Sequence, residues 1–252
     1  MPFGSFPRVT DIFDDLEAEY EHLDGVLAGL APAQWAHPSA CAGWTVADVV
    51  LHLAQSEELT AASIAGDDAL FAEERAGNVD AVADDLVAAQ RDIAPADLLW
   101  RWRTAAFATP TALRAQPQGA RLRWITSRIS PAALATTRLA EAWTHAHDIT
   151  DLLGIPYPDT ARLRHVAWLG HRTLPYAFAI EEIEGGPVYC ELTAPDGQTW
   201  HFGDPGAPSA ITGPAAEFCR VGARRLTPAD STLQATGPHG AQALAVLRNY
   251  AT

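Results

Sequence analysis

The sequence predicts a mainly α-helical protein, with a four-helix bundle over residues 1–158 followed by a small α+β domain over residues 159–252. Three observations support this fold class. Apolar residues recur at three- and four-residue steps through most of the first part, as in amphipathic helices. After residues 154–160, "GIPYPDT", the pattern changes to alternation around a turn. With 252 residues, 48% of them hydrophobic, the chain is long enough to bury a sizeable core.

The first two helices of the bundle have clear patterns. Residues 11–30 form an amphipathic helix that ends near Gly29. Its apolar stripe consists of Ile12, Leu16, Tyr20, Leu23 and Leu27. Thr45 is the expected N-cap of a second helix, because Asp48 follows three positions later in a capping-box arrangement.

The middle of the bundle is less regular. Residues 66–80 are polar and contain glycine, which indicates a loop or a short helix. Residues 79–93 and 94–116 supply a third long helix with a shorter helical lead-in. Pro110 is expected to break this helix, because proline lacks a backbone N–H and clashes with the preceding turn. Residues 117–129 are expected to be a connection.

The last helix of the bundle has favourable signals at both ends. It starts at Ser130-Pro131, a suitable cap and first-turn pair, and ends at Gly154. Its apolar positions keep a 4-3-4-3-4 spacing, which is expected of helices that pack nearly parallel. These positions are Ala135, Leu139, Ala142, Ala146, Ile149 and Leu153.

The C-terminal part mixes strands and helices. Residues 187–204 alternate around Pro195-Asp196-Gly197, which predicts a β-hairpin. Residues 213–226 and 237–252 have helical patterns, and residues 231–237 form a further candidate strand. Together they indicate a small α+β domain.

The composition argues against several classes of function. The formal net charge is −14 and there are no basic runs. Binding to nucleic acid or to an anionic membrane is therefore not expected, because phosphate neutralisation supplies most of the non-specific affinity. Three widely spaced cysteines without a C-x-x-C pair argue against a disulfide framework and a thiolate zinc site. Without an apolar leader or a run of about 18 apolar residues, a cytoplasmic protein is expected.

The segment "LAEAWTHAHDITDLLG", residues 139–154, carries the chemistry. At about 100° per residue, Glu141 and His145 lie about 40° apart on one helical face, and Asp148 lies about 20° from Glu141. His147 points elsewhere. Glu141, His145 and Asp148 lie beside the apolar seam of the helix. Charged and polar side chains are tolerated there only if they are paired or bind a metal. The alternative is a solvated face with an i,i+4 glutamate–histidine pair.

A third metal ligand has to come from another helix. His52 is the best candidate, because it lies on the inward flank of the second helix beside Leu53. Asp48 or Gln55 could orient its far ring nitrogen. Two histidines and one glutamate form a set that zinc uses in catalytic sites, with the fourth position left for water or substrate. The same set suits non-haem iron, so the ligands alone do not name the metal.

Two motifs contain these residues. The first is Gly43-Trp44-Thr45-Val46-x-Asp48 followed by His52, and the second is Arg138-Leu139-x-Glu141-x-Trp143-x-His145-x-x-Asp148, closed by Leu153-Gly154. Both resemble the mycothiol-dependent maleylpyruvate isomerase family, which belongs to the wider DinB-like superfamily of metal-binding four-helix bundles. The stretches "TAPDGQTWHFGD" and "ITGPAAEFCRVGARR" resemble the second domain of that family more loosely. The resemblance covers nearly the whole chain.

The resemblance implies that His52, Glu141 and His145 bind zinc or another divalent metal, with mycothiol or a similar low-molecular-weight thiol as a further ligand. It implies a zinc-dependent, thiol-assisted isomerase or thiol transferase that acts on a small electrophilic, carboxylate-bearing substrate. Zinc lowers the pKa of a bound thiol, and a thiolate can add to an electron-poor alkene. Rotation about the resulting single bond and loss of the thiolate then give the trans isomer.

Arg138 and Asp148 are the candidate catalytic residues. Arg138 lies one turn before Glu141 and about 60° away around the helix, so it is expected at the rim of the site, where it can bind a carboxylate. A salt bridge at the surface or behind the ligands is the alternative. Further candidates are Arg121, Arg123 and Arg128, which lie in the connection before the last helix of the bundle. The pair Arg224-Arg225 is expected to be a solvated helix end.

Two other functions remain open. One is a metal-dependent enzyme of specialised metabolism with the same fold, in which the metal acts directly on substrate or water. The other is a metal- or ligand-binding protein without turnover. Pairing of two chains into a homodimer through their helices is a further expectation, and the sequence does not identify the substrate.

Overall fold

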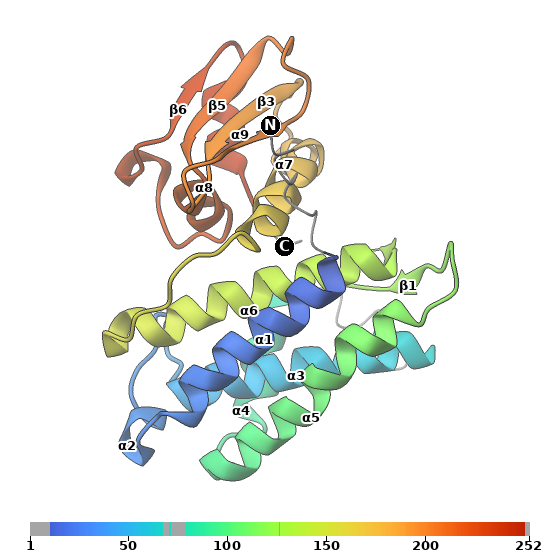
Figure 1. Ribbon diagram of the computed structural model, residues 1–252, viewed down its shortest axis with the longest axis vertical. Helices are drawn as coiled ribbons and strands as arrows, with labels where there is room; N and C mark the ends of the chain where they lie inside the picture. The colour runs from blue at the N-terminus through green and yellow to red at the C-terminus, as the bar shows by residue number, and fades with distance from the viewer. Residues whose placement is uncertain (1–10, 68–70, 72–78, 126, 250–252) are drawn as a thin grey trace, which may run out of the picture.

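The protein consists of a helical bundle and a smaller α+β part, seen below and above in the computed structural model of Figure 1. The structure describes residues 11–67, 71, 79–125 and 127–249. Most of the expected loop or short helix at 66–80 therefore lies outside the described residues. The predicted fold class, an N-terminal DinB-like four-helix bundle followed by a small α+β domain, is confirmed.

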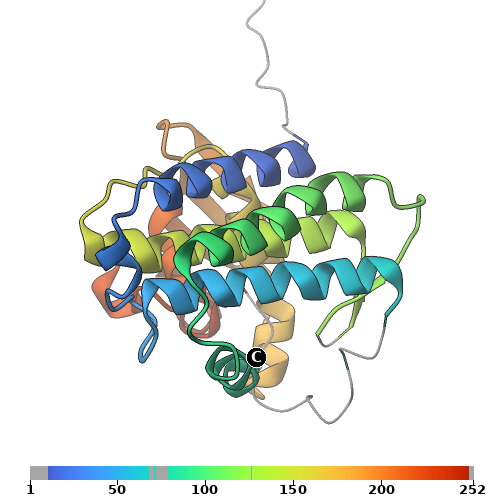
Figure 2. The ribbon, with the colours of Figure 1, turned by 90° about the horizontal axis from the view of Figure 1, so that it is seen from below.

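Four long helices form the bundle and lie alongside one another in Figure 2. They are α1 (Ile12–Ala28), α3 (Val46–Ala65), α5 (Pro95–Arg114) and α6 (Pro131–Leu153). Shorter elements connect them: α2 (Pro32–Trp35), α4 (Val79–Ala88), β1 (Leu122–Arg123) and β2 (Arg128–Ile129). The two short strands pair antiparallel, where the sequence indicated only a connection.

The ends of the long helices follow the predicted capping signals. Thr45 accepts a hydrogen bond from the backbone N–H of Asp48, and the Asp48 carboxylate accepts one from the Thr45 N–H at 2.9 Å. The Ser130 hydroxyl caps α6 at Ala133. Gly154 ends α6 with φ of 65°, in the left-handed region that favours glycine. These caps determine where along the bundle the residues of α3 and α6 lie.

The prediction about Pro110 is wrong, because α5 continues through it. A proline inside a helix removes one hydrogen bond, at a cost of about 3 kcal/mol in an exposed helix. Here Pro110 is buried, and α5 packs against both α1 and α3. Tertiary packing therefore outweighs the local preference.

The C-terminal part packs helices on a four-stranded sheet. Its strands are β3 (Val188–Thr193), β4 (Thr199–Phe202), β5 (Ser209–Pro214) and β6 (Gln234–Thr236), in the order β4-β3-β5-β6. The β3–β4 hairpin turns at Gly197 as predicted, and β3 pairs parallel with β5. Its helices are α7 (Leu163–Ile180), α8 (Ala215–Gly222), η3 (Pro228–Asp230) and α9 (Gly240–Val246).

Three of these elements, α7, β5 and the short η3, were not expected from the sequence. The pattern of α7 is interrupted by Gly170 and Pro175, which disfavour helix. Gly170 is needed because a Cβ there would lie 2.8 Å from the Asn249 side chain. The five residues of β5 that precede Pro214 are Ser209, Ala210, Ile211, Thr212 and Gly213, which show no clear alternation.

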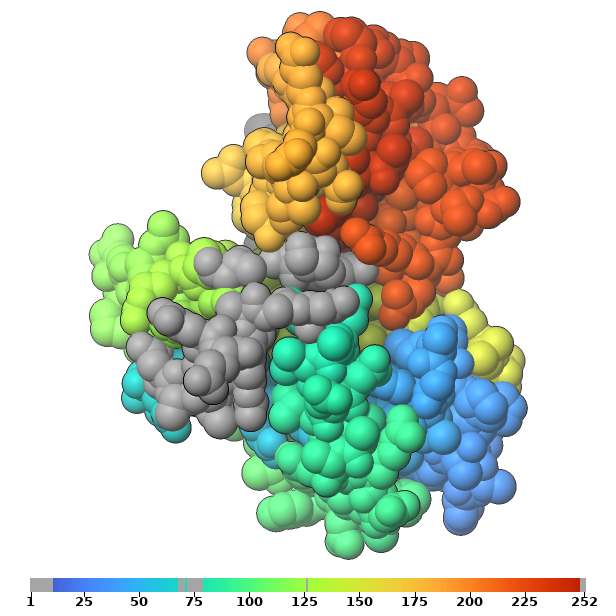
Figure 3. All heavy atoms as spheres, turned by 180° about the vertical axis from the view of Figure 1, so that it is seen from behind, coloured from blue at the N-terminus to red at the C-terminus, as the bar shows by residue number. Residues whose placement is uncertain are grey.

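The link between α6 and α7 contains residue 158, where we propose to divide the chain into domains 1–158 and 159–252. The space-filling view shows the C-terminal part lying against one side of the bundle (Figure 3). Within the described ranges, no helix is both long enough and apolar enough to cross a membrane.

Candidate metal centre

Three side chains from two helices converge between α3 and α6. His52 comes from α3, and Glu141 and His145 come from α6. Glu141 Oε1 lies 2.9 Å from His52 Nε2 and 3.2 Å from His145 Nε2. One donor atom from each of the three residues lies within 4.8 Å of the others. The structure thus brings together the three residues that the sequence analysis singled out as ligands.

This convergence follows from how the two helices begin and pack. The cap at Thr45 places His52 two turns into α3, and α3 packs against α6. Glu141 and His145 are one turn apart, so both side chains point to one spot on α6. The ring of Trp44 lies 5.2 Å from the His52 ring, centroid to centroid, and borders the site.

The site is mostly buried but not closed. The exposed fractions of the side chains are 16% for His52, 10% for His145 and 28% for Glu141. Partial exposure at Glu141 leaves an approach for a small molecule. A catalytic metal site needs such an open position, whereas a structural site is closed by four protein ligands.

The three groups perturb one another strongly. Burial disfavours the ionised form of Glu141, but hydrogen bonds from His145 and His52 outweigh it and hold the Glu141 pKa well below its usual range. Burial lowers the pKa of His52. Burial also opposes the charged form of His145, yet its hydrogen bonds to Asp148, Cys41 and Glu141 raise its pKa. The site thus pairs a carboxylate with two imidazoles of unlike basicity.

The residues fit a divalent metal ion. Both histidines direct Nε2 at the same carboxylate oxygen, so a cation there would meet two nitrogens and one oxygen. The other ring nitrogen of His145, Nδ1, lies 2.9 Å from Asp148 Oδ2. Such a carboxylate partner sets the tautomer in which Nε2 is free to bind a metal.

Asp148 lies behind the candidate ligands, and its contacts extend to the C-terminal part. Its side chain is 1% exposed. Besides His145, it contacts Arg225 at 2.6 and 2.7 Å, and the Cys41 thiol donates to its Oδ2 at 3.1 Å. Burial opposes ionisation of Asp148, but Arg225 and His145 outweigh it and hold its pKa far below the usual range. Asp148 is therefore a carboxylate that orients His145.

Arg138 is not at the rim of the site, and that expectation is wrong. The residue is 2% exposed, and its Nε donates to Glu57 Oε1 at 2.9 Å inside the bundle. Its guanidinium carbon lies 5.6 Å from the centroid of the Trp124 ring. Burial opposes its charge, but Glu57 and Glu141 outweigh burial and raise its pKa. Arg138 Nη2 is buried without a hydrogen-bond partner among the described residues.

The expected partners of His52 have other contacts. Asp48 accepts hydrogen bonds from Thr45 and Arg91, and Gln55 donates to the Leu86 carbonyl. Neither residue is hydrogen-bonded to His52 in the part of the chain that the structure describes. The suggestion that they orient its far nitrogen is therefore wrong for this arrangement.

Two residues of the site were missed. Cys41 has no motif around it. Arg225 follows the end of α8 at an exposed position, as expected, but its guanidinium pairs with the buried Asp148, which was not expected. One feature of the sequence could have indicated that Asp148 has a partner. Asp148 lies beside the apolar seam, and a buried carboxylate requires a cation or several hydrogen-bond donors. That feature does not say which of the 17 arginines is used.

Only Cys41 among the three cysteines is partly exposed. Burial raises the pKa of Cys190 to about 12 and that of Cys219 well above the usual range, which makes both thiols inert. We expect an aromatic disulfide reagent to modify about one thiol rapidly in the folded protein and all three after unfolding. The Cys41→Ser variant serves as control and should lose the rapid phase. Rapid modification of two or more thiols in the folded state would contradict this assignment.

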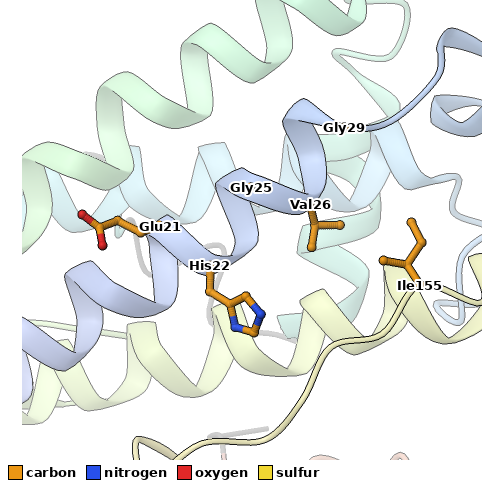
Figure 4. A pocket seen from close by; sticks show the side chains of 6 residues that line it. All are labelled: Glu21, His22, Gly25, Val26, Gly29 and Ile155. Atoms are coloured by element: carbon orange, nitrogen blue, oxygen red, sulfur yellow. The ribbon is translucent and has the colours of Figure 1, made fainter.

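Two hollows lie outside the centre. One, of about 460 Å³, lies along α1 and is lined by Glu21, His22, Gly25, Val26, Gly29 and Ile155 (Figure 4). None of the predicted site residues lines it. The other, of about 520 Å³, lies in the C-terminal part and includes Arg224, Arg225 and Arg248. It adjoins the centre through Arg225.

Residues 16–150 match a family model described as the mycothiol maleylpyruvate isomerase N-terminal domain. Uncharacterised proteins from two strains of Mycobacterium tuberculosis are each 35% identical to this chain over 246 residues, with 94% of both chains covered.

Two solved structures share the fold. A crystal structure of the mycothiol-dependent maleylpyruvate isomerase has a TM-score of 0.60 at 14% identity, covering 89% of this chain and 91% of that one. A mutant form of that isomerase has a TM-score of 0.58 at 13% identity, covering 85% and 89%. The family match spans more than half of the chain and includes α3 and most of α6, with all three candidate ligands. The chain therefore belongs to the mycothiol maleylpyruvate isomerase N-terminal domain family.

Proposed function

We propose that this protein is a zinc-dependent, thiol-assisted isomerase or thiol transferase that acts on a small electrophilic substrate bearing a carboxylate. The observation that carries the proposal is the convergence of His52, Glu141 and His145 at a partly open site. Membership of the family supports mycothiol as the thiol. Zinc is proposed over iron because the family resemblance favours it, since both metals suit this ligand set.

In this proposal the protein holds and orients the reactants. His52, Glu141 and His145 bind the metal, and Asp148 fixes the tautomer of His145 through Nδ1. Zinc bound there would lower the pKa of the bound thiol, so that it would be present as the thiolate near neutral pH. Trp44, whose ring lies 5.2 Å from the His52 ring, would form part of the wall of the substrate site.

Arg138 is proposed to act on the substrate carboxylate. Its Nη2 is buried without an acceptor among the described residues, which is costly for a charged donor, by about 1–3 kcal/mol or more. Glu57 holds the other side of the guanidinium. An arginine that keeps one amino group unpaired beside Glu141 is suited to receive an anionic group of a ligand. In this proposal the carboxylate would be bound inside the bundle, where Arg138 is 2% exposed.

The proposal is tested by metal analysis followed by a thiol titration and an activity assay. We expect about one zinc per chain, a thiol-dependent change in the spectrum of the cobalt-substituted protein, and cis–trans isomerisation of maleylpyruvate only when mycothiol is present. Without mycothiol the rate should fall to background, because the nucleophile is absent.

The outcomes separate the alternative functions. Bound zinc with no response to mycothiol would replace the proposal with an enzyme whose metal acts directly on substrate or water. A metal that accepts no further ligand, or the absence of bound metal, would favour a protein without turnover.

A further inference from the structure

Arg225 connects the C-terminal part of the chain to the candidate metal centre. Its Nε donates to Asp148 Oδ1 at 2.6 Å, and its Nη2 donates to Asp148 Oδ2 at 2.7 Å. The guanidinium thus grips the carboxylate with two parallel hydrogen bonds, which is the strongest geometry for such a pair. Because Asp148 is 1% exposed and Arg225 28% exposed, little solvent screens their interaction.

Asp148 contacts both Arg225 and His145. The oxygen that Arg225 Nη2 contacts, Oδ2, also lies 2.9 Å from His145 Nδ1. A chain of hydrogen bonds therefore runs from Arg225 through Asp148 to His145, whose Nε2 faces the other candidate ligands. Any rotation of the Asp148 carboxylate would change the orientation of the His145 ring.

The backbone around Arg225 is built to aim its side chain at the bundle. Helix α8 ends at Gly222, and Arg224 adopts φ of 57°, a left-handed conformation that is unfavourable for a residue with a Cβ. The Arg225 N–H donates back to the Arg220 carbonyl at 2.8 Å, and its Nη1 donates to the Ala223 carbonyl at 3.0 Å. These contacts hold the arginine in place before a ligand binds.

We propose that Arg225 is a positioning residue for the metal ligand His145, and that metal affinity is coupled through it to docking of the C-terminal domain. The inference rests on the proposed metal centre. A carboxylate partner that orients a ligating histidine increases metal affinity, and removing it commonly costs about 10–100-fold. Coupling of this kind is reciprocal, so metal binding in turn stabilises the contact between Arg225, which follows α8, and Asp148 of α6.

Arg220 provides a matched control. It lies on α8 and also reaches α6, where its Nη1 contacts Asp151 at 3.1 Å and its Nη2 contacts His147 Nδ1 at 3.0 Å. It belongs to the same interface as Arg225 but contacts neither Asp148 nor His145 among the described hydrogen bonds. A general effect of losing one arginine from this interface would appear equally in both variants.

The first test measures zinc affinity by competition with a chromophoric chelator. We expect Arg225→Gln to bind zinc about 10-fold more weakly than wild type, and Arg220→Gln to stay within about two-fold. Arg225→Lys keeps the charge but only one contact, so its affinity should be intermediate. Circular dichroism checks that each variant is folded. Equal affinities in Arg225→Gln and Arg220→Gln would overturn the inference and leave the proposed metal centre intact.

The second test measures the reverse direction of the coupling. Zinc should slow hydrogen–deuterium exchange in residues 220–226 of the wild type, and this protection should be lost in Arg225→Gln while it persists in Arg220→Gln. Zinc binding without any added protection in the wild type would overturn the coupling alone. A wild-type protein that binds no zinc at all would overturn the proposed function and the inference together.

Discussion

Replacing either His52 or His145 with alanine should remove the metal while leaving the fold intact. We expect bound zinc to fall from about one ion per chain to background, because two remaining donors do not form a stable zinc site. Both variants should keep the helical circular dichroism of the wild type, since the two side chains lie at the partly open site and not in the apolar seam. Elemental analysis after gel filtration measures the bound metal.

His201→Ala is the matched control for this loss. His201 lies on β4 with 54% of its side chain exposed, far in sequence from both motifs. The control should keep the full zinc content and the thiol-dependent activity. If His52→Ala or His145→Ala retained full metal stoichiometry, the assignment of the ligands would be wrong.

Removing the charge of Glu57 should cause the largest loss of stability. Its Oε1 accepts hydrogen bonds from Tyr20 at 2.6 Å and from Arg138 at 2.9 Å, and its Oε2 accepts one from Thr109 at 2.9 Å. Glu57→Gln leaves the buried Arg138 cation without its hydrogen-bonded counter-ion, so we expect the free energy of unfolding to fall by about 3–5 kcal/mol. Urea denaturation followed by circular dichroism gives this value.

The neighbouring residue supplies the control for that experiment. Glu58 pairs with Arg101 nearer the surface, and 42% of its side chain is exposed. Glu58→Gln removes the same charge from the same helix, yet it should cost less than about 1 kcal/mol, because solvent screens an exposed pair. A loss from Glu57→Gln as small as that from Glu58→Gln would show that the buried pair does not stabilise the bundle.

Local signals in the sequence were sufficient for the bundle and for the two motifs. The caps at Thr45 and Ser130 and the glycine at Gly154 act within one turn of the backbone, so the ends of α3 and α6 were predictable. The spacing of Glu141 and His145 on one helix is likewise a local property. Long-range packing decided that Pro110 lies inside α5 and that α7 forms despite Gly170 and Pro175.

The surroundings of the centre could not be predicted in the same way. The orientation of Arg138 depends on Glu57, which lies 81 positions away in the chain, and the helical wheel alone placed it at the rim. Arg225 lies 77 positions from Asp148, in the turn that follows α8 in the other part of the chain. No periodic pattern links residues so far apart in the chain. The neighbouring arginines Arg224 and Arg225 also show no local feature in the sequence that indicates which of them pairs with Asp148.

The sequence by itself therefore determined helices α1, α3 and α6 of the bundle, the caps of α3 and α6, and the pairing of a glutamate and a histidine on one face of α6. These depend on backbone hydrogen bonds and side-chain spacing within a few residues. Only the tertiary structure decided which distant groups satisfy the buried charges: Glu57 for Arg138, and Arg225 for Asp148. The physical reason is that a buried charge needs a counter-charge but does not specify its place in the chain, so the partner is set by how the elements pack.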